Sequence, residues 1–192
     1  AFLPAIKGAL AAQKINGTIT LSGYEGSELL VARLLIESGA DVPYVGTACA
    51  KTPWSERDLD WLTAKGVKVK FRASLEDDCA AMEAIKPDLA IGTTPVVQKG
   101  KEFGIPSLYF TNLISARPLM GPAGAGSLAQ VVNAAMSNKD RMDHMRAFFE
   151  GVGHADTAGI WEGSPNERPD FRATHQKKLD KAARAAKAQE MI

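Results

Sequence analysis

The sequence predicts an α/β fold built on a mainly parallel sheet of five strands. Three observations predict it: short apolar segments alternate with helical segments, Gly and Pro mark most junctions between them, and hydrophobic residues make up 45% of the chain. Regular alternation of this kind places helices on both faces of a parallel sheet. We therefore expect a Rossmann-like three-layer αβα domain with strand order 3-2-1-4-5, plus C-terminal helices. The expected strands are Thr18–Ser22, Val42–Gly46, Val67–Phe71, Asp88–Gly92 and Ser107–Phe110.

A short helix, Pro4–Gln13, precedes the segment around which the chain is organised, Gly17–Val45. This segment indicates a strand, a turn, a helix and a second parallel strand, joined by a right-handed crossover. The helix starts at Glu28 and is apolar on most of its surface, so we expect it to be covered on more than one side. Ser27 is the expected N-terminal cap of this helix, and Gly39 is its expected end.

Three further helices are expected between the later strands, with recognisable start and stop signals. They are Ser55–Lys65, Ser74–Ile85 and Pro95–Phe103. The hydroxyl and carboxylate groups of Ser55 with Asp58, and of Ser74 with Asp77, can satisfy free N–H groups at the first two starts. Gly66, Pro87 and Gly104 mark the three ends.

The composition changes after the fifth strand. Thr111–Ser127 contains several Gly and Pro residues and predicts a long loop that opens a helix from Leu128 to about Ser137. A second helix is expected at Lys139–Glu150. We therefore expect one domain over residues 1–150, and an irregular arm with a basic C-terminal helix over residues 151–192. The tail helix has little apolar surface and is expected to dock on another chain or to fray.

Charge and hydropathy limit the possible functions. The formal net charge is +1, and the excess of Lys and Arg is confined to the tail, so we do not expect nucleic-acid binding. No apolar run is long enough to span a bilayer, and the N-terminal residues lack a signal-peptide layout. We expect a soluble, cytoplasmic protein without a transmembrane segment. Because the chain begins without Met, we expect it to be a segment of a longer polypeptide.

The chain has two cysteines, Cys49 and Cys79. Two thiols cannot supply the four ligands of an iron–sulfur cluster or of an all-Cys zinc site, and a disulfide is not expected in the cytoplasm. Cys79 is expected to be a small buried side chain within a helix. Cys49 should lie on a loop at the ligand-binding edge of the sheet, and the sequence leaves open whether it has a role there.

Polar turns follow the central strands of the expected sheet. Ligands of open α/β sheets bind outside the carboxyl ends of the strands, where helix N-termini direct their N–H groups. Gly23–Ser27 and the hydroxyls of Thr93 and Thr94 lie at that edge, although Gly23–Ser27 lacks the spacing of a dinucleotide fingerprint. Glu25 is the one carboxylate that the sequence places there. The alternative is that these turns only join and cap elements.

The Gly-rich segment Gly121–Ser127 invites a phosphate-loop interpretation, but the Lys that a Walker loop requires is missing. Its backbone N–H groups, at Gly124, Gly126 and Ser127, can bind an anion, with the positive charge of Arg117 nearby. The alternative is close packing of this helix against the sheet. The three His residues lack metal-ligand spacing, and no nucleophile–base arrangement is present. We therefore do not expect the chain to be a catalyst by itself.

Four long motifs carry a resemblance to a known family. They are Gly23–Arg33, Val45–Cys49 with Thr52-Pro-Trp54, Ile91–Gln98 and Tyr109–Ser127. These motifs resemble the Y-subunit family of chlorophyllide a reductase, which is one of the nitrogenase-like reductases. The likeness runs from about Gly17 to Trp161 and corresponds to the C-terminal part of such a subunit. It implies a nitrogenase-type Rossmann-like domain.

The resemblance also implies a function for the whole assembly. In this family the Y and Z subunits form a catalytic component that carries a 4Fe–4S cluster and binds chlorophyllide a. It reduces the C7=C8 double bond of ring B, on the route to bacteriochlorophyll a. Electrons come from a separate ATP-hydrolysing iron–sulfur protein, the X subunit, which holds ATP and Mg. The cluster cysteines are expected in the N-terminal part of the subunit, so this chain alone is expected to hold no metal and to be inactive.

A nitrogenase-like arrangement gives the polar turns a role as one wall of the substrate cleft. The candidates for that wall are Tyr24, Glu25, Thr93, Thr94, Asn112 and Arg117. Arg117 is expected to pair either with a propionate of the chlorin or with Glu25. The competing hypotheses are a Rossmann-like module that binds a nucleotide or small molecule without redox chemistry, and a purely structural interaction domain.

Overall fold

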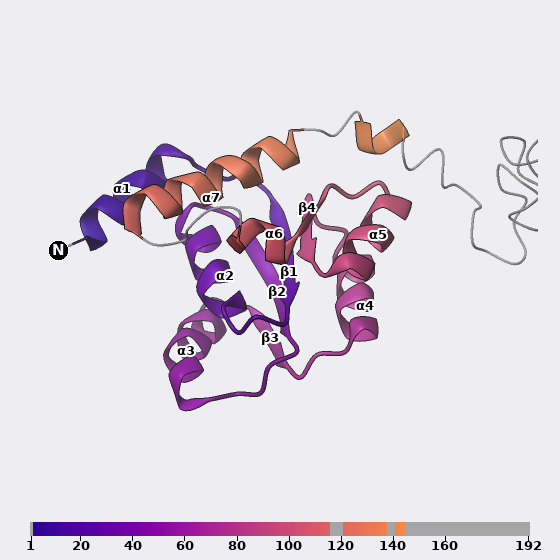
Figure 1. Cartoon of the computed structure of the whole chain (residues 1–192), viewed down its shortest axis with the longest axis horizontal. Helices are drawn as coiled ribbons and strands as arrows, with labels where there is room; N and C mark the ends of the chain where they lie inside the picture. Colours follow the sequence, from indigo (N-terminus) through magenta and orange to yellow (C-terminus); the bar gives the residue numbers. More distant parts are fainter. Residues whose placement is uncertain (1, 116–120, 138–140, 145–192) are drawn as a thin grey trace, which may run out of the picture. The chain divides into compact units, whose positions relative to one another are not determined.

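The computed structural model describes residues 2–115, 121–137 and 141–144 (Figure 1). All of them belong to a first compact unit, Ala1–Arg146, and the second unit is Ala147–Ile192. Several predictions lie outside the described residues: Arg117, the irregular arm, the basic tail helix and most of the helix expected at Lys139–Glu150. Of that last helix, residues 141–144 are described and are helical. The proposed domain boundary at residue 150 stays a prediction.

The sheet has five strands in the order β3-β2-β1-β4-β5, and every neighbouring pair is parallel. Both the order and the mainly parallel pairing were predicted and are confirmed. Each strand lies within one or two residues of its expected position. The strands are β1 (Thr18–Gly23), β2 (Asp41–Thr47), β3 (Lys68–Phe71), β4 (Leu89–Gly92) and β5 (Ser107–Tyr109).

Helices cover both faces of the sheet (Figure 1). On one face α2 (Glu28–Glu37) packs against α3 (Glu56–Ala64), and on the other α4 (Leu75–Ile85) packs against α5 (Thr94–Glu102). This division follows from the strand order, because right-handed crossovers place a helix on opposite faces when the chain moves in opposite directions along the sheet. The N-terminal helix α1 (Leu3–Ala12) lies along α7 (Gly121–Met136), close to α2.

The hydrophobic core forms one cluster on each side of the sheet. The larger cluster joins apolar side chains of α2, β1, β2 and α7, among them Leu21, Leu35 and Val132, which are fully buried. The smaller cluster lies beneath α4 and α5 around Met82 and Val96. Central strands are buried on both faces in such a sheet, and they therefore show continuous apolar runs rather than alternation.

Most helix ends follow the predicted signals. Gly39, Gly66 and Gly104 have φ values of 101°, 80° and 69°, which side-chain-bearing residues rarely adopt, and each follows the helix that it was expected to end. Ser74 and Asp77 form the predicted capping box of α4: the Asp77 N–H donates to Ser74 Oγ, and the Ser74 N–H donates to the Asp77 carboxylate, at 3.2 and 3.0 Å.

Two predicted caps are wrong. Ser55 does not cap α3, because a 3₁₀ turn, η1 (Pro53–Ser55), precedes that helix and the Ser55 hydroxyl accepts from the Thr52 N–H at 3.1 Å. Asp58 instead forms a 3.0 Å ion pair with Arg33 of α2. Ser27 makes no capping bond to α2, and its buried hydroxyl has no hydrogen-bond partner among the residues that the structure describes.

The prediction of a long loop is also wrong for the part of it that the structure describes, residues 111–115 and 121–127. Helix α6 (Phe110–Ser115) begins directly after β5, and α7 begins at Gly121 rather than at Leu128. The small residues of this stretch suit a helix that packs closely, since an added Cβ at Gly126 would lie 3.7 Å from the Cβ of Ala9 in α1. Apolar packing therefore overrides the composition that favoured a loop.

None of the helices within the described residues has the length and apolar character that a membrane crossing requires.

Candidate functional site

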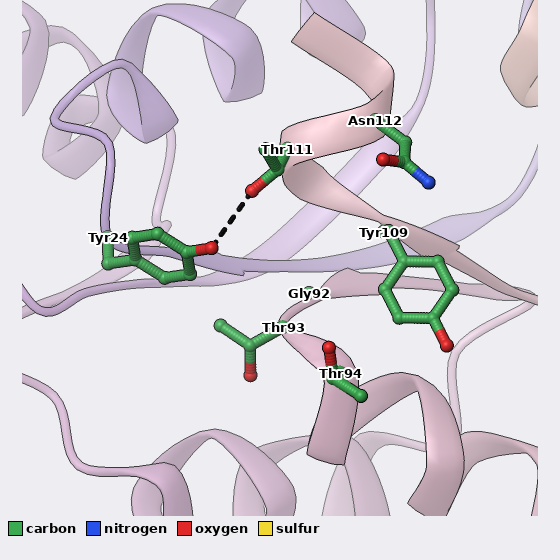
Figure 2. Close-up of a pocket in the computed structure, with 7 residues that line it drawn as sticks. All are labelled: Tyr24, Gly92, Thr93, Thr94, Tyr109, Thr111 and Asn112. Carbon is green, nitrogen blue, oxygen red and sulfur yellow. Dashed lines mark hydrogen bonds between the residues drawn. The ribbon is translucent and has the colours of Figure 1, made fainter. Parts of the chain in front are cut away.

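A pocket of about 270 Å³ opens at the carboxyl edge of the sheet, between β1, β4 and β5 (Figure 2). The residues that line it are Tyr24, Gly92, Thr93, Thr94, Tyr109, Thr111 and Asn112. They come from segments far apart in the sequence, which meet here because neighbouring parallel strands end at the same edge of a sheet. Tyr24 follows β1, Thr93 and Thr94 follow β4, and Thr111 and Asn112 belong to α6.

The two sides of the pocket are joined by hydrogen bonds. Tyr24 Oη and Thr111 Oγ1 are 3.1 Å apart, and Figure 2 draws this hydrogen bond as a dashed line. The Thr111 hydroxyl in turn donates to Glu25 Oε1 at 3.2 Å. Because a carboxylate only accepts and a Thr hydroxyl has a single proton, Tyr24 is the donor in the first bond. This chain of contacts connects the turn after β1 to helix α6.

Four of the six predicted wall residues line this pocket: Tyr24, Thr93, Thr94 and Asn112. Glu25 lies at the margin, where it contacts the pocket through Thr111, and Arg117 is outside the described residues. Thr111 and Tyr109 were not among the predicted wall residues, because the sequence predicts a loop at Thr111 and a strand at Tyr109. Tyr109 ends β5 and Thr111 follows it closely, at the same edge as the other candidates, and this position was the signal that could have identified them.

The predicted anion-binding N–H groups do not gather at a helix start. Because α7 begins at Gly121, only Gly124 of the three candidates lies in the first turn, where N–H groups lack intrahelical partners. Gly126 and Ser127 lie deeper in the helix, where N–H groups bond to the carbonyls four residues earlier. Gly124 is itself buried.

A buried carboxylate lies beneath the turn after β1. Glu28, the first residue of α2, is 0% exposed. Its Oε1 accepts from the N–H of Glu25 at 2.7 Å and of Gly26 at 3.3 Å, and its Oε2 accepts from the Thr47 hydroxyl at 3.0 Å. Glu28 was not among the residues predicted from the sequence to have a role. Its carboxylate accepts hydrogen bonds from N–H groups of the turn before the helix. Ser27, the expected cap of that helix, makes no such bond.

The loop after β2 lies beside the same turn and carries Cys49. The Cys49 N–H donates to Thr47 Oγ1 at 3.2 Å, and the thiol donates to the backbone carbonyl of Tyr24 at 3.5 Å. Cys49 is partly exposed and forms no disulfide, and Cys79 is likewise a free cysteine. Burial raises the pKa of the Cys79 thiol, which is partly buried at the edge of the smaller core cluster.

A second buried carboxylate lies on the opposite face of the sheet. Asp78 of α4 is 7% exposed and accepts from the hydroxyl of Tyr44 at 2.8 Å. Desolvation by burial is the main reason that the pKa of Asp78 rises to about 6, and the hydrogen bond from Tyr44 opposes that rise. Burial and the neighbouring Asp78 both raise the pKa of Tyr44.

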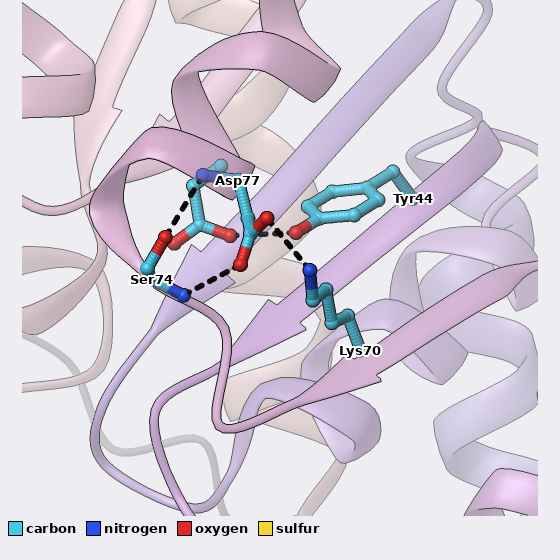
Figure 3. Close-up of polar contacts among 5 residues, drawn as sticks. Tyr44, Lys70, Ser74 and Asp77 are labelled. Atoms are coloured by element: carbon cyan, nitrogen blue, oxygen red, sulfur yellow. Dashed lines mark hydrogen bonds and ion pairs between the residues drawn. The ribbon is translucent and has the colours of Figure 1, made fainter.

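An exposed cluster adjoins this pair at the start of α4 (Figure 3). Lys70 of β3 forms a 2.6 Å ion pair with Asp77, which also closes the capping box with Ser74. The hydrogen bond from Lys70 and the bond from the Ser74 N–H lower the pKa of Asp77 to about 2. These contacts hold α4 at the carboxyl edge of β3, and they are structural rather than part of the pocket.

The pocket lining can form hydrogen bonds but offers little acid–base chemistry. Among the residues that the structure describes, the lining contains hydroxyl groups and one amide, and no Asp, Glu, His, Lys, Arg or Cys. Within the described residues, no group of three or more His, Cys, Asp or Glu side chains is arranged to hold a metal ion. The geometry is therefore that of a binding wall, on which uncharged polar groups and planar rings can be positioned.

Comparison with known proteins gives consistent matches. Residues 2–137 match the family described as Nitrogenase component 1 type Oxidoreductase. Two curated proteins called "Chlorophyllide reductase 52.5 kDa chain", from Cereibacter sphaeroides and Rhodobacter capsulatus, are 77% and 72% identical over 192 residues. All of this chain is covered, and it spans 38% and 39% of the length of those relatives.

Among solved structures, "Nitrogenase Cp1 at pH 6.5" is similar in fold, with a TM-score of 0.57 and 21% sequence identity. The match covers 72% of this chain and 32% of that one.

Proposed function

Because the chain belongs to the nitrogenase component 1 type oxidoreductase family, we propose that it is part of the catalytic component of chlorophyllide a reductase. In this proposal the complete component reduces the C7=C8 double bond of ring B of chlorophyllide a. The observation that carries the proposal is the identity of 77% and 72% with two chlorophyllide reductase chains over the full 192 residues. Since the family match concerns an oxidoreductase, the alternative of a nucleotide-binding module without redox chemistry is not favoured.

The finer assignments belong to the same proposal. We assign the chain to the Y subunit, with the Z subunit as its partner in the catalytic component. The X subunit, an ATP-dependent iron–sulfur protein that depends on Mg, is the proposed electron donor. The long motifs shared with that family support this assignment.

The residues of this chain do not fit a 4Fe–4S cluster. Such a cluster requires four ligands, mostly thiolates, and the chain has two cysteines, which lie on a loop after β2 and within α4. We therefore assign the residues of this chain no part in binding the cluster. We propose that the cysteines that bind the cluster lie on other segments of the reductase complex.

The role we propose for this chain is to form one wall of the substrate cleft. Tyr24, Thr94, Tyr109 and Asn112 present polar groups and rings at the carboxyl edge of the sheet, where ligands of α/β folds bind. Hydroxyl and amide groups suit the uncharged oxygen atoms at the rim of the macrocycle, and the two Tyr rings offer apolar faces. Positioning of the pigment, rather than proton transfer, is what these side chains can do.

The test uses the full-length subunit in its complex. Replacing Thr94 by Val and Asn112 by Ala removes two polar groups at about 1 kcal/mol each, so we expect a roughly 30-fold weaker affinity for chlorophyllide a. Gln98→Ala is the matched control, since it removes an exposed amide from α5 outside the pocket. Unchanged pigment affinity in the double variant, measured by fluorescence titration, would remove this pocket from the substrate site.

A further inference from the structure

The geometry points to Glu28 as a positioning residue: its buried carboxylate fixes the turn Tyr24–Gly26, which forms one side of the pocket. The contacts of Glu28 fix this turn whatever the ligand, and the consequence for chlorophyllide rests on the proposed function.

Glu28 accepts three hydrogen bonds through its two carboxylate oxygens. A carboxylate that is 0% exposed requires donors for both oxygens, because an unpaired buried charge is strongly destabilising. Two of its three donors are consecutive backbone N–H groups of the turn, at 2.7 and 3.3 Å. Bonds from neutral donors to a charged acceptor are stronger than those between neutral groups. Glu28 therefore determines the path of the backbone on the C-terminal side of Tyr24.

The Glu28 carboxylate occupies a space beside Gly23 that a side chain at position 23 would fill. Gly23 ends β1, and a Cβ added there would lie 2.5 Å from Glu28 Oε1 and 2.9 Å from Phe110 Cδ1. The absence of a side chain at Gly23 thus lets the carboxylate reach the turn from below. Phe110, which is buried at the start of α6, closes the other side of this space. The carboxylate is held by packing as well as by hydrogen bonds.

Hydrogen bonds connect Glu28 to the turn after β1 and to the loop after β2. Thr47 donates its hydroxyl proton to Glu28 Oε2 and accepts from the Cys49 N–H on the same oxygen. The Cys49 thiol donates to the carbonyl of Tyr24. The backbone on the C-terminal side of Tyr24 is therefore held by contacts that lead back to Glu28. The Tyr24 side chain stays 55% exposed, and its hydroxyl reaches Thr111 across the pocket. Loss of the carboxylate frees the turn and the Cys49 loop together.

This arrangement provides a readout that does not depend on substrate. Alkylation of Cys49 by iodoacetamide, followed residue by residue with mass spectrometry on the full-length complex, reports opening of the loop against the turn. Cys79, on α4, serves as the internal reference. In Glu28→Ala we expect the rate at Cys49 to rise about tenfold while the rate at Cys79 stays unchanged, because local opening costs less than global unfolding.

Three further variants separate positioning from general loss of stability. Glu28→Gln keeps an acceptor for the two turn N–H groups, so we expect near-normal labelling. Asp78→Ala removes the other buried carboxylate, on the opposite face of the sheet, and should leave Cys49 labelling unchanged. Thr47→Val removes the hydroxyl between Glu28 and Cys49 without changing the side-chain shape, and should raise Cys49 labelling. If Glu28→Ala yields no folded complex, Cys49 labelling in Thr47→Val tests the positioning role of Glu28 instead.

Chlorophyllide titration and steady-state kinetics on the same variants complete the test. We expect Glu28→Ala to raise KM and the dissociation constant about tenfold with a smaller change in kcat, and Glu28→Gln to restore both. Equal Cys49 labelling in Glu28→Ala, Thr47→Val and the unmodified complex would overturn the positioning role. Faster labelling with unchanged pigment affinity would support the positioning role and count against the pocket as the chlorophyllide site.

Discussion

Replacing Asp78 by Asn should change the pH dependence of stability in a direction that the structure determines. The carboxyl group is 7% exposed, accepts from the Tyr44 hydroxyl and lies over Gly46, where an added Cβ would collide with it. Burial, together with the nearby charges of Asp77 and Glu28, favours its protonated form, whereas Tyr44 and Lys70 favour the charged form. Burial is the largest of these influences, so the folded protein binds a proton here more tightly than the unfolded chain does.

The magnitude follows from the two pKa values. A pKa of about 6 in the fold, against 3.8 for an unperturbed Asp, corresponds to about 3 kcal/mol. Because the pKa is raised, this contribution to stability is complete below pH 3.8 and is lost as the pH rises through about 6. Asn does not titrate. The free energy of unfolding of Asp78→Asn, relative to the unmodified chain, should therefore increase by about 3 kcal/mol between pH 3.5 and pH 7.5.

The assay is urea denaturation of the two proteins at several pH values, followed by circular dichroism. Asp60→Asn is the control, because Asp60 is an exposed carboxylate on α3 that lies outside the pair. Its difference from the unmodified chain should stay nearly constant over the same range. A constant difference for Asp78→Asn as well would refute the argument that burial keeps this carboxyl group protonated.

Two further substitutions test the backbone and the packing. Lys86 follows α4 with a φ of 51°, so Lys86→Gly should raise the free energy of unfolding by about 0.5–1 kcal/mol in thermal or urea unfolding; a loss of stability would show that the Lys side chain compensates for this conformation. Gly23→Ala should lower stability by about 1–3 kcal/mol, because its Cβ would collide with Glu28 and Phe110. Unchanged stability there would mean that Glu28 can move without cost.

The topology could be predicted because its signals are local. Each strand and helix carries its own apolar pattern and punctuation, such as Gly39, Gly66 and Gly104, and right-handed crossovers restrict the arrangement of the resulting elements. Four wall candidates also lie together for this reason, since any polar residue that follows a parallel strand reaches the same edge. The function, in contrast, was inferred from a family resemblance and not from this geometry.

The failures share a different cause. Residues 111–115 and 121–127 lie in helices α6 and α7, and α7 packs against α1 and the sheet. Such contacts between distant segments are not visible in the composition of one segment. Glu28 was overlooked for the same reason. A Glu at the start of a helix normally faces solvent, and its burial here depends on Gly23, Thr47 and Phe110. Ser27, the expected cap, makes no side-chain bond to α2, and the neighbouring Glu28 accepts instead from N–H groups of the turn before the helix.

Gly23 and Gly46 lie on adjacent strands, and a carboxylate from a helix occupies the volume above each of them. The side chains at positions 23 and 28 therefore compete for one space, and those at positions 46 and 78 compete for another. A larger residue at position 23 is compatible only with a shorter one at position 28, and the same holds for positions 46 and 78. Among homologues we expect these pairs to substitute jointly, so that co-variation at 23/28 and 46/78 would mark the two faces of the sheet independently of any ligand.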